Sequence, residues 1–149
     1  MTTNTIEKTD TSMEMTRTFN ATREQVFAAW ADPEQRKAWS GCNGSTCISY
    51  THDFETGGDY RQVLEIPDCG QVVIVGTFTK IEEPAVIAYS MNCEGMDDTP
   101  DSHVELTFTE EGGKTQLHLR HTDLVDAEAC EAVSGGHQAS FDRLKEILH

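Results

Sequence analysis

The sequence has few basic residues and no long apolar run. Lys and Arg number 11 against 26 Asp and Glu, which gives a net charge of −15. Because nucleic acids and anionic membranes attract clustered Lys and Arg, the lack of a basic stripe argues against both as partners. No stretch of 18 apolar residues occurs, so no transmembrane helix is predicted. Residues 1–10 are polar and lack the apolar core of a signal peptide, so we expect a cytoplasmic protein.

The sequence also lacks the short motifs that mark common active sites and metal sites. It has no Ser/His/Asp signature, no phosphate-binding glycine loop and no zinc-protease motif. Its five cysteines include no Cys-x-x-Cys pair, and an odd number in a cytoplasmic protein favours free thiols. Cys42 and Cys47 are separated by four residues, a poor spacing for metal ligands. We therefore expect no cofactor and no metal, and we assign no catalytic residue.

Two capped helices are predicted between residues 22 and 39. Thr22 and Gln25 have the spacing of a capping box, in which each side chain accepts the backbone N–H of the other residue. Asp32 and Pro33 mark a second helix start, because an acidic N-cap and a proline at the first helical position both favour helix entry. This segment therefore predicts a pair of short helices laid over another part of the fold.

Most of the remaining chain predicts an antiparallel sheet. Short segments in which apolar and polar residues alternate are separated by Gly- and Pro-containing turns of hairpin length. In residues 47–54 the side chains expected to share one face are Ile48, Tyr50, His52 and Phe54. The predicted fold class is α+β, with a curved antiparallel sheet of six to seven strands, two short helices, and one long C-terminal helix packed across the sheet. We expect residues 1–10 to form a flexible tail and residues 11–149 to form a single domain.

The C-terminal helix is predicted over residues 127–148. Its apolar stripe, with spacings of three and four, consists of Val133, His137, Phe141, Leu144 and Leu148. Gly135 and Gly136 lie inside this helix, where each glycine costs about 1 kcal/mol relative to alanine. Close packing against another backbone or a bend around a bound object would offset that cost. A sheet curved around such a helix leaves a gap, which is the natural place for a small-molecule site.

Seven short motifs occur in a fixed order along nearly the whole chain. They are Arg17–Glu34 with Trp39, Gly57–Tyr60, Pro67–Gly70, Gly76–Pro84, Val104–Glu110, Gly113–His121 and Gly136–Leu144. Together they resemble the START-like (SRPBCC, Bet v-like) superfamily, and within it the AHSA-like branch of heat-shock chaperone ATPase activator homologues. The resemblance implies the helix-grip fold. It implies no reaction, because members range from lipid carriers and hormone receptors to polyketide cyclases and chaperone activators.

Two positions depart from the pattern of that family. Members often have a second aromatic residue after the tryptophan that corresponds to Trp39, where this chain has Ser40–Cys42. Members also commonly have Gly-Trp in the long helix, where this chain has Gly136 and His137. An imidazole in place of an indole leaves more room and adds a polar group to the wall of the cavity.

The residues expected to line the cavity and contact a ligand are Trp39, Tyr60, Tyr89, Met91, His121, His137 and Phe141. Tyrosine hydroxyls can fix the orientation of a ligand, whereas the alternative for these aromatic residues, and for Phe141 above all, is ordinary core packing. We expect Trp30 in the core. Trp39 ends the second helix, so we expect it at the mouth of the pocket.

The histidines leave several interpretations open. His137 is either a hydrogen-bonded wall residue or a ligand partner and general base, since imidazole titrates near neutral pH. His121 is expected to point inward from its strand. A metal site of His52, His121 and His137 is conceivable, but no local ligand spacing supports it. His103 and His118 alternate with apolar residues and are expected to face solvent.

Three functions from different classes fit these features. The first is binding of a small hydrophobic or amphipathic molecule between the sheet and the C-terminal helix, by burial and a few polar anchors. The second is an enzyme of the polyketide cyclase/dehydratase type, with His137 or His121 as base. The third is a protein-interaction module similar to a co-chaperone, with a chaperone or a second copy in a homodimer as partner.

Overall fold

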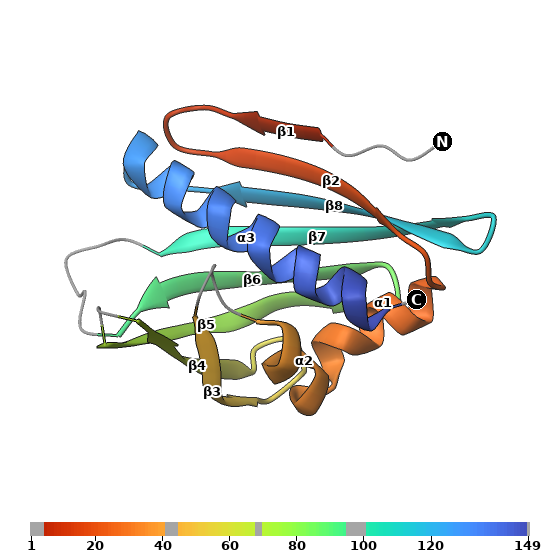
Figure 1. Ribbon diagram of the computed structural model, residues 1–149, viewed down its shortest axis with the longest axis horizontal. Helices are drawn as coiled ribbons and strands as arrows, with labels where there is room; N and C mark the ends of the chain where they lie inside the picture. Colours follow the sequence, from red (N-terminus) through yellow and green to blue (C-terminus); the bar gives the residue numbers. More distant parts are fainter. Residues whose placement is uncertain (1–4, 41–44, 68–69, 95–100, 149) are drawn as a thin grey trace.

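Eight strands form one antiparallel sheet in the order β1-β2-β8-β7-β6-β5-β4-β3, in a computed structural model that describes residues 5–40, 45–67, 70–94 and 101–148. The strands are β1 (Thr5–Lys8), β2 (Met13–Phe19), β3 (Thr46–His52), β4 (Asp59–Ile66), β5 (Gly70–Glu82), β6 (Val86–Cys93), β7 (Ser102–Glu111) and β8 (Lys114–Thr122). The helices are α1 (Arg23–Ala31), α2 (Pro33–Trp39) and α3 (Ala127–Ile147). Figure 1 shows α3 lying across one face of the sheet, with α1 and α2 at one end. None of these helices has the length and apolarity that a membrane-crossing helix needs.

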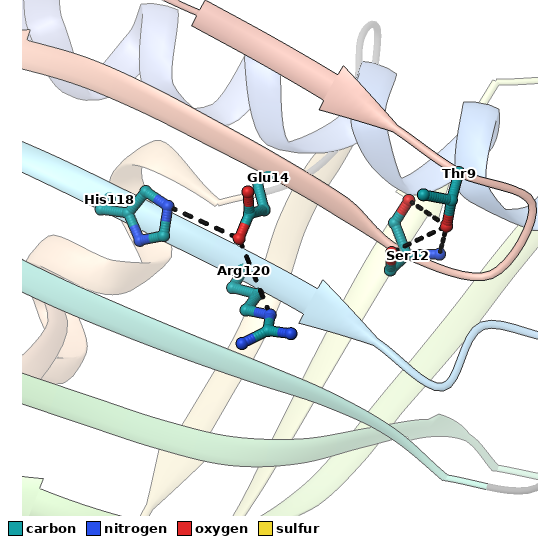
Figure 2. Close-up of polar contacts among 5 residues, drawn as sticks. All are labelled: Thr9, Ser12, Glu14, His118 and Arg120. Carbon is teal, nitrogen blue, oxygen red and sulfur yellow. Dashed lines mark hydrogen bonds and ion pairs between the residues drawn. The ribbon is translucent and has the colours of Figure 1, made fainter.

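The sheet has one strand more than the six to seven that the sequence predicted. The additional strand is β1, which forms the sheet edge in a segment where we expected a flexible tail. It pairs antiparallel with β2 along its whole length. Thr9 holds the connecting turn, because its hydroxyl lies 2.8 Å from the Ser12 hydroxyl and accepts the Ser12 backbone N–H at 3.0 Å (Figure 2). A four-residue strand with mostly polar side chains has no alternating pattern long enough to be recognised in the sequence.

The helices begin where the sequence predicted. The backbone N–H of Gln25 is accepted by the Thr22 hydroxyl at 3.3 Å, and the Gln25 side chain accepts the Thr22 N–H at 2.9 Å. Asp32 caps α2 by accepting the backbone N–H of Glu34 at 3.0 Å. Asp126 caps α3 in the same way. These caps fix the directions in which the helices leave their turns, and so they set which side chains face the sheet.

The sheet has a polar outer face and an apolar inner face. On β2 and β8, Glu14 lies directly opposite Arg120, and its carboxylate is 3.7 Å from the Arg120 guanidinium and 3.9 Å from His118 (Figure 2). The next residues along these strands, Met15 and Leu119, point the other way and are only 2% and 1% exposed. The expectation that His118 faces solvent is therefore confirmed.

One strand face differs from the prediction. The pairing of β3 with β4 shifts between Cys47 and Ser49, which inserts an extra residue into β3. Ile48 is consequently 40% exposed, whereas Cys47 and Tyr50 are buried. Strict alternation had placed Ile48 on the inner face with Tyr50, and the bulge is the reason that it is not there.

Candidate functional site

A cavity of about 250 Å³ lies between the sheet and α3. Each of five neighbouring strands contributes an apolar side chain to its floor: Leu64, Ile74, Met91, Leu106 and Leu119. The opposite wall comes from α3, with Val133 and Phe141, and one end is closed by Trp30 and Trp39. At roughly 30 Å³ for each water-sized group, this volume has room for about eight of them. The cavity therefore suits a small ligand rather than a long lipid.

Six of the seven side chains that the sequence assigned to a ligand site line this cavity: Trp39, Tyr60, Tyr89, Met91, His137 and Phe141. They come from α2, β4, β6 and α3, which are far apart in the sequence. His121 is the exception, because it is fully buried and contacts His137 of the lining without lining the cavity itself. That the six bind a ligand stays a prediction.

The two tryptophans form a packed pair at the end of the cavity. Their ring centroids lie 4.6 Å apart, and the indole N–H of Trp39 donates to the Ala29 carbonyl at 3.0 Å. We expected Trp39 at a solvent-facing mouth, but it is only 1% exposed, against 3% for Trp30. The capped turn between α1 and α2 folds Trp39 back onto α1, which explains its burial. Both indoles line the cavity, so their fluorescence reports on what it contains.

The two tyrosine hydroxyls in the cavity lining differ in their hydrogen bonds. The Tyr60 hydroxyl donates to the Ser90 carbonyl at 2.7 Å, and this bond ties the ring to the sheet. The Tyr89 hydroxyl makes no hydrogen bond with another residue in the described parts of the chain. Burial raises the pKa of Tyr89, with an opposing effect from Arg36. Tyr89 is therefore the tyrosine available to orient a ligand.

His137, which lines the cavity from α3, forms a hydrogen-bonded pair with His121 of β8. His137 Nε2 lies 3.0 Å from His121 Nδ1, and His121 Nε2 lies 2.8 Å from the Ser102 hydroxyl. Ser102 donates its one proton to the Met91 carbonyl at 3.2 Å, so it accepts from His121 Nε2–H. His121 Nδ1 then carries a lone pair and accepts from His137 Nε2–H. These donor directions leave Nδ1 of His137 as an acceptor, with no partner among the described residues.

Burial keeps both imidazoles neutral. Burial, with smaller contributions from His121 and Arg36, lowers the pKa of His137 to about 3. Burial also lowers the pKa of His121 to about 4, with a smaller effect from His103. A general base works best when its pKa lies near the working pH. The pair is therefore better suited to hydrogen bonding than to proton abstraction at neutral pH.

Three polar residues of the cavity wall were missed by the assignment from sequence, namely Arg36, Gln62 and Ser140. Gln62 lies between Tyr60 and Leu64 on the inner face of β4, and the alternation of that strand did place it inward. Arg36 precedes Trp39 by three residues, so the two share a face of α2. That spacing is the signal which could have brought Arg36 into the predicted site.

His52 is held away from the other two histidines of the conceivable metal site. Its Nδ1 lies 2.9 Å from the Tyr50 hydroxyl and its Nε2 lies 3.1 Å from the Ala31 carbonyl. Within the described residues, no three His, Cys, Asp or Glu side chains are grouped so that they could hold a metal ion. Cys42 and Cys69 lie outside those residues, whereas the described Cys47, Cys93 and Cys130 are free thiols.

The two glycines of α3 have different surroundings. A Cβ atom on Gly135 would meet nothing within 4 Å, so close packing does not account for that glycine. Gly136 lines the cavity. A bend of α3 around a bound molecule at Gly136 therefore stays a prediction.

The fold and the chain are similar to a known family and to solved structures. A family model described as activator of Hsp90 ATPase homolog 1-like protein matches residues 20–149. A protein from Rhodobacter sphaeroides is 24% identical, with 97% of each chain covered and a TM-score of 0.82. A protein from Mycobacterium smegmatis is 21% identical, with 99% of this chain and 98% of that chain covered and a TM-score of 0.83. An AHSA1 protein from Silicibacter pomeroyi is 23% identical, with 91% and 95% covered and a TM-score of 0.80. No curated protein matches the chain.

Proposed function

Because the chain belongs to the family of activator of Hsp90 ATPase homolog 1-like proteins, we propose that it uses the START-like fold to bind a small hydrophobic or amphipathic molecule. The ligand occupies the cavity between the sheet and α3. The observation that carries this proposal is the convergence of side chains from five strands and all three helices on one mostly apolar space. Apolar burial supplies most of the binding free energy, and the few polar groups fix the orientation of the ligand.

The size of the cavity sets the expected affinity. A ligand that buries roughly 200 Å² of apolar surface gains about 5 kcal/mol at 25 cal/mol per Å². Association and ordering costs reduce this gain, and hydrogen bonds to the polar wall add to it. We therefore expect dissociation constants on the order of 1 mM or weaker for simple apolar probes. The cognate ligand binds more tightly through its polar contacts.

Thermal unfolding and tryptophan fluorescence test the proposal together. Probes such as medium-chain fatty acids, alcohols and small aromatic polyketides should raise the melting temperature, because they bind the folded state alone. The same probes should change the emission of Trp30 and Trp39, which line the cavity. A broad panel that shifts neither quantity would overturn the proposal.

A cavity-filling variant and a matched control locate the binding. Val133 lines the cavity from α3, so Val133→Phe should reduce the volume and abolish the shifts. Val125 is 60% exposed and lies before α3, so Val125→Phe makes the same chemical change outside the cavity. Retained binding in Val133→Phe, with a native circular dichroism spectrum, would contradict binding in the cavity.

The enzymatic alternative has less support. A base for a cyclase or dehydratase reaction would be His137 or His121, and burial lowers the pKa of both far below neutrality. If such a reaction exists, His137→Phe should abolish turnover without unfolding the protein. Retained turnover would exclude His137 as the base.

Chaperone binding is the alternative that the family description suggests. The large apolar side chains exposed in the described residues are Ile6, Ile48, Val125 and Ile147. They belong to four separate segments, which favours no single docking surface. A pull-down from lysate that recovers no chaperone would remove this alternative. We propose the cytoplasm as the compartment, because the described Cys47, Cys93 and Cys130 are free thiols, which are typical of a reducing compartment.

A further inference from the structure

The lining of the cavity contains a cation without a carboxylate partner. Arg36 lines the cavity, and no Asp or Glu is found with it among the described lining residues. None of the ion pairs within the described residues involves Arg36. The chain has 26 Asp and Glu residues, so a lining with an arginine and no carboxylate differs from the charge balance of the chain as a whole. A ligand that supplies the missing negative charge would complete the site.

The guanidinium of Arg36 is held in place by its neighbours. Its central carbon lies 4.4 Å from the Trp39 ring centroid and 5.6 Å from the Tyr50 ring centroid. One nitrogen, Nη1, donates to the Ser40 hydroxyl at 2.6 Å. Guanidinium has five N–H donors, and its planar fork matches a carboxylate with two parallel hydrogen bonds. The stacked and anchored guanidinium is thus preorganised to bind a planar anion.

Gln62 provides a second, independent donor. It is 5% exposed, it lines the cavity, and its Nε2 has no hydrogen-bond partner within the described residues. A buried donor without a partner costs about 1–3 kcal/mol. A ligand oxygen placed against Nε2 would remove that cost, so the site gains binding free energy from an acceptor at this position.

Arg36 and Gln62 lie at the same end of the cavity. Gln62 lies directly opposite Tyr50 in the pairing of β4 with β3, and the guanidinium carbon of Arg36 lies 5.6 Å from the Tyr50 ring centroid. Both groups are therefore close to Tyr50, beside the Trp39 end of the space. The other described residues of the lining are uncharged and mostly apolar, with few polar groups, among them the Tyr89 hydroxyl. One end of the cavity thus offers a positive charge, and the rest is uncharged and mostly apolar.

We propose that the ligand is a small amphipathic carboxylic acid, whose carboxylate accepts hydrogen bonds from Arg36 and Gln62 while its apolar part fills the cavity, a specification that rests on the function proposed above. The cavity of about 250 Å³ fits a medium-length chain or a single aromatic ring. Octanoate has this size and charge, and 1-octanol has the same chain without the charge. The difference in affinity between the two isolates the contribution of the carboxylate.

Calorimetric titration of the full chain at neutral pH with octanoate and with 1-octanol tests the proposal. Wild type should bind octanoate on the order of tenfold or more tightly than 1-octanol, because hydrogen bonds to a charged group are worth about 1.5–3 kcal/mol. Arg36→Met keeps an apolar stem against Trp39 and should remove most of this preference, with 1-octanol affinity changed by less than about twofold. Gln62→Glu places a negative charge at the second donor and should also remove most of the preference for octanoate over 1-octanol.

Lys145→Met is the matched control, since Lys145 is an exposed cation of α3 outside the cavity lining. It removes the same charge and should leave the preference unchanged. Should Arg36→Met fail to fold, Gln62→Glu and the wild-type comparison still decide the matter. Equal affinity of wild type for the two probes, binding of 1-octanol alone, or an equal loss in Lys145→Met would overturn the carboxylic-acid proposal and leave the proposed function standing. Binding of neither probe would overturn both.

Discussion

Nε2 of His137 lies 3.0 Å from Nδ1 of His121, so the His137 N–H donates to His121 and links α3 to β8. The link continues through Ser102 to the backbone of β6. His137 turns this part of the cavity wall into a polar network. Protonation of His121 at Nδ1 would remove the acceptor for the His137 N–H, and this makes the network sensitive to pH.

Stability should fall as the pH is lowered below about 6.5. Burial lowers the pKa of His137 to about 3 and of His121 to about 4, whereas in the unfolded chain both imidazoles titrate near 6.5. Between these values the unfolded state binds more protons than the folded state, so the free energy of unfolding decreases as the pH falls. We expect a loss on the order of 5 kcal/mol between about pH 7 and about pH 4.5, with about half from each imidazole, measured by urea unfolding.

The double variant His121→Leu with His137→Phe is the control for this pH dependence. Carboxylates also begin to titrate near pH 4.5, and they contribute equally to both proteins. The difference between wild type and the double variant therefore isolates the imidazoles. An unchanged pH dependence in the double variant would contradict the account of the pair.

Single replacements should show that the two imidazoles stabilise the fold as a unit. His121→Leu removes two hydrogen bonds at a fully buried position, so we expect a cost of about 2–3 kcal/mol. His137→Phe removes one, at a partly buried position, and should cost about 1 kcal/mol. A double-mutant cycle measured by urea unfolding should give a coupling of about 1 kcal/mol. Strict additivity would mean that the 3.0 Å contact does not stabilise the fold.

Gly76 and Gly135 have different surroundings and should respond to replacement by alanine with opposite changes in stability. A Cβ atom on Gly76 would lie 1.9 Å from the Ser90 carbonyl oxygen and 2.7 Å from the Tyr60 ring. Since backbone atoms of a sheet cannot give way cheaply, we expect Gly76→Ala to cost about 3 kcal/mol or more in thermal or urea unfolding. It should also displace Tyr60 and weaken ligand binding.

Gly135→Ala is the companion to that variant. A Cβ atom there meets nothing within 4 Å, and alanine favours the helix over glycine by about 1 kcal/mol. We therefore expect a gain in stability of up to about 1 kcal/mol with unchanged ligand binding. A loss of stability in this variant, or none in Gly76→Ala, would show that the packing described for α3 or β5 is incorrect.

The features that could be predicted from the sequence depend on residues close together in the chain. The capping box of Thr22 and Gln25 forms within one helical turn, so its spacing is visible in the sequence. The inward direction of Tyr60 and Gln62 follows from strict alternation along β4. Six cavity-lining residues were identified in the same way, because local periodicity tells which side of an element faces the core.

The features that were missed depend on pairing between distant segments. The bulge that exposes Ile48 arises from the register of β3 against β4. The inward direction of His121 follows from the alternation along β8. Its contact with His137 instead depends on where α3 passes β8, which the sequence does not show. From the sequence, Arg36 resembles an ordinary surface residue of a short helix. Its place in the cavity wall becomes visible only in the structure, where its guanidinium lies over the Trp39 and Tyr50 rings. Such arrangements become visible only when the elements are assembled.

The most direct test of the central claim is an NMR measurement of where a small amphipathic probe binds. Intermolecular nuclear Overhauser effects between unlabelled 1-octanol and the 13C-labelled protein identify the contacting side chains without requiring a carboxylate on the ligand. The account predicts contacts to Met91, Leu119 and Trp30, which line the cavity. Contacts confined to the exposed side chains of Ile48 or Val125, or none at all, would contradict it.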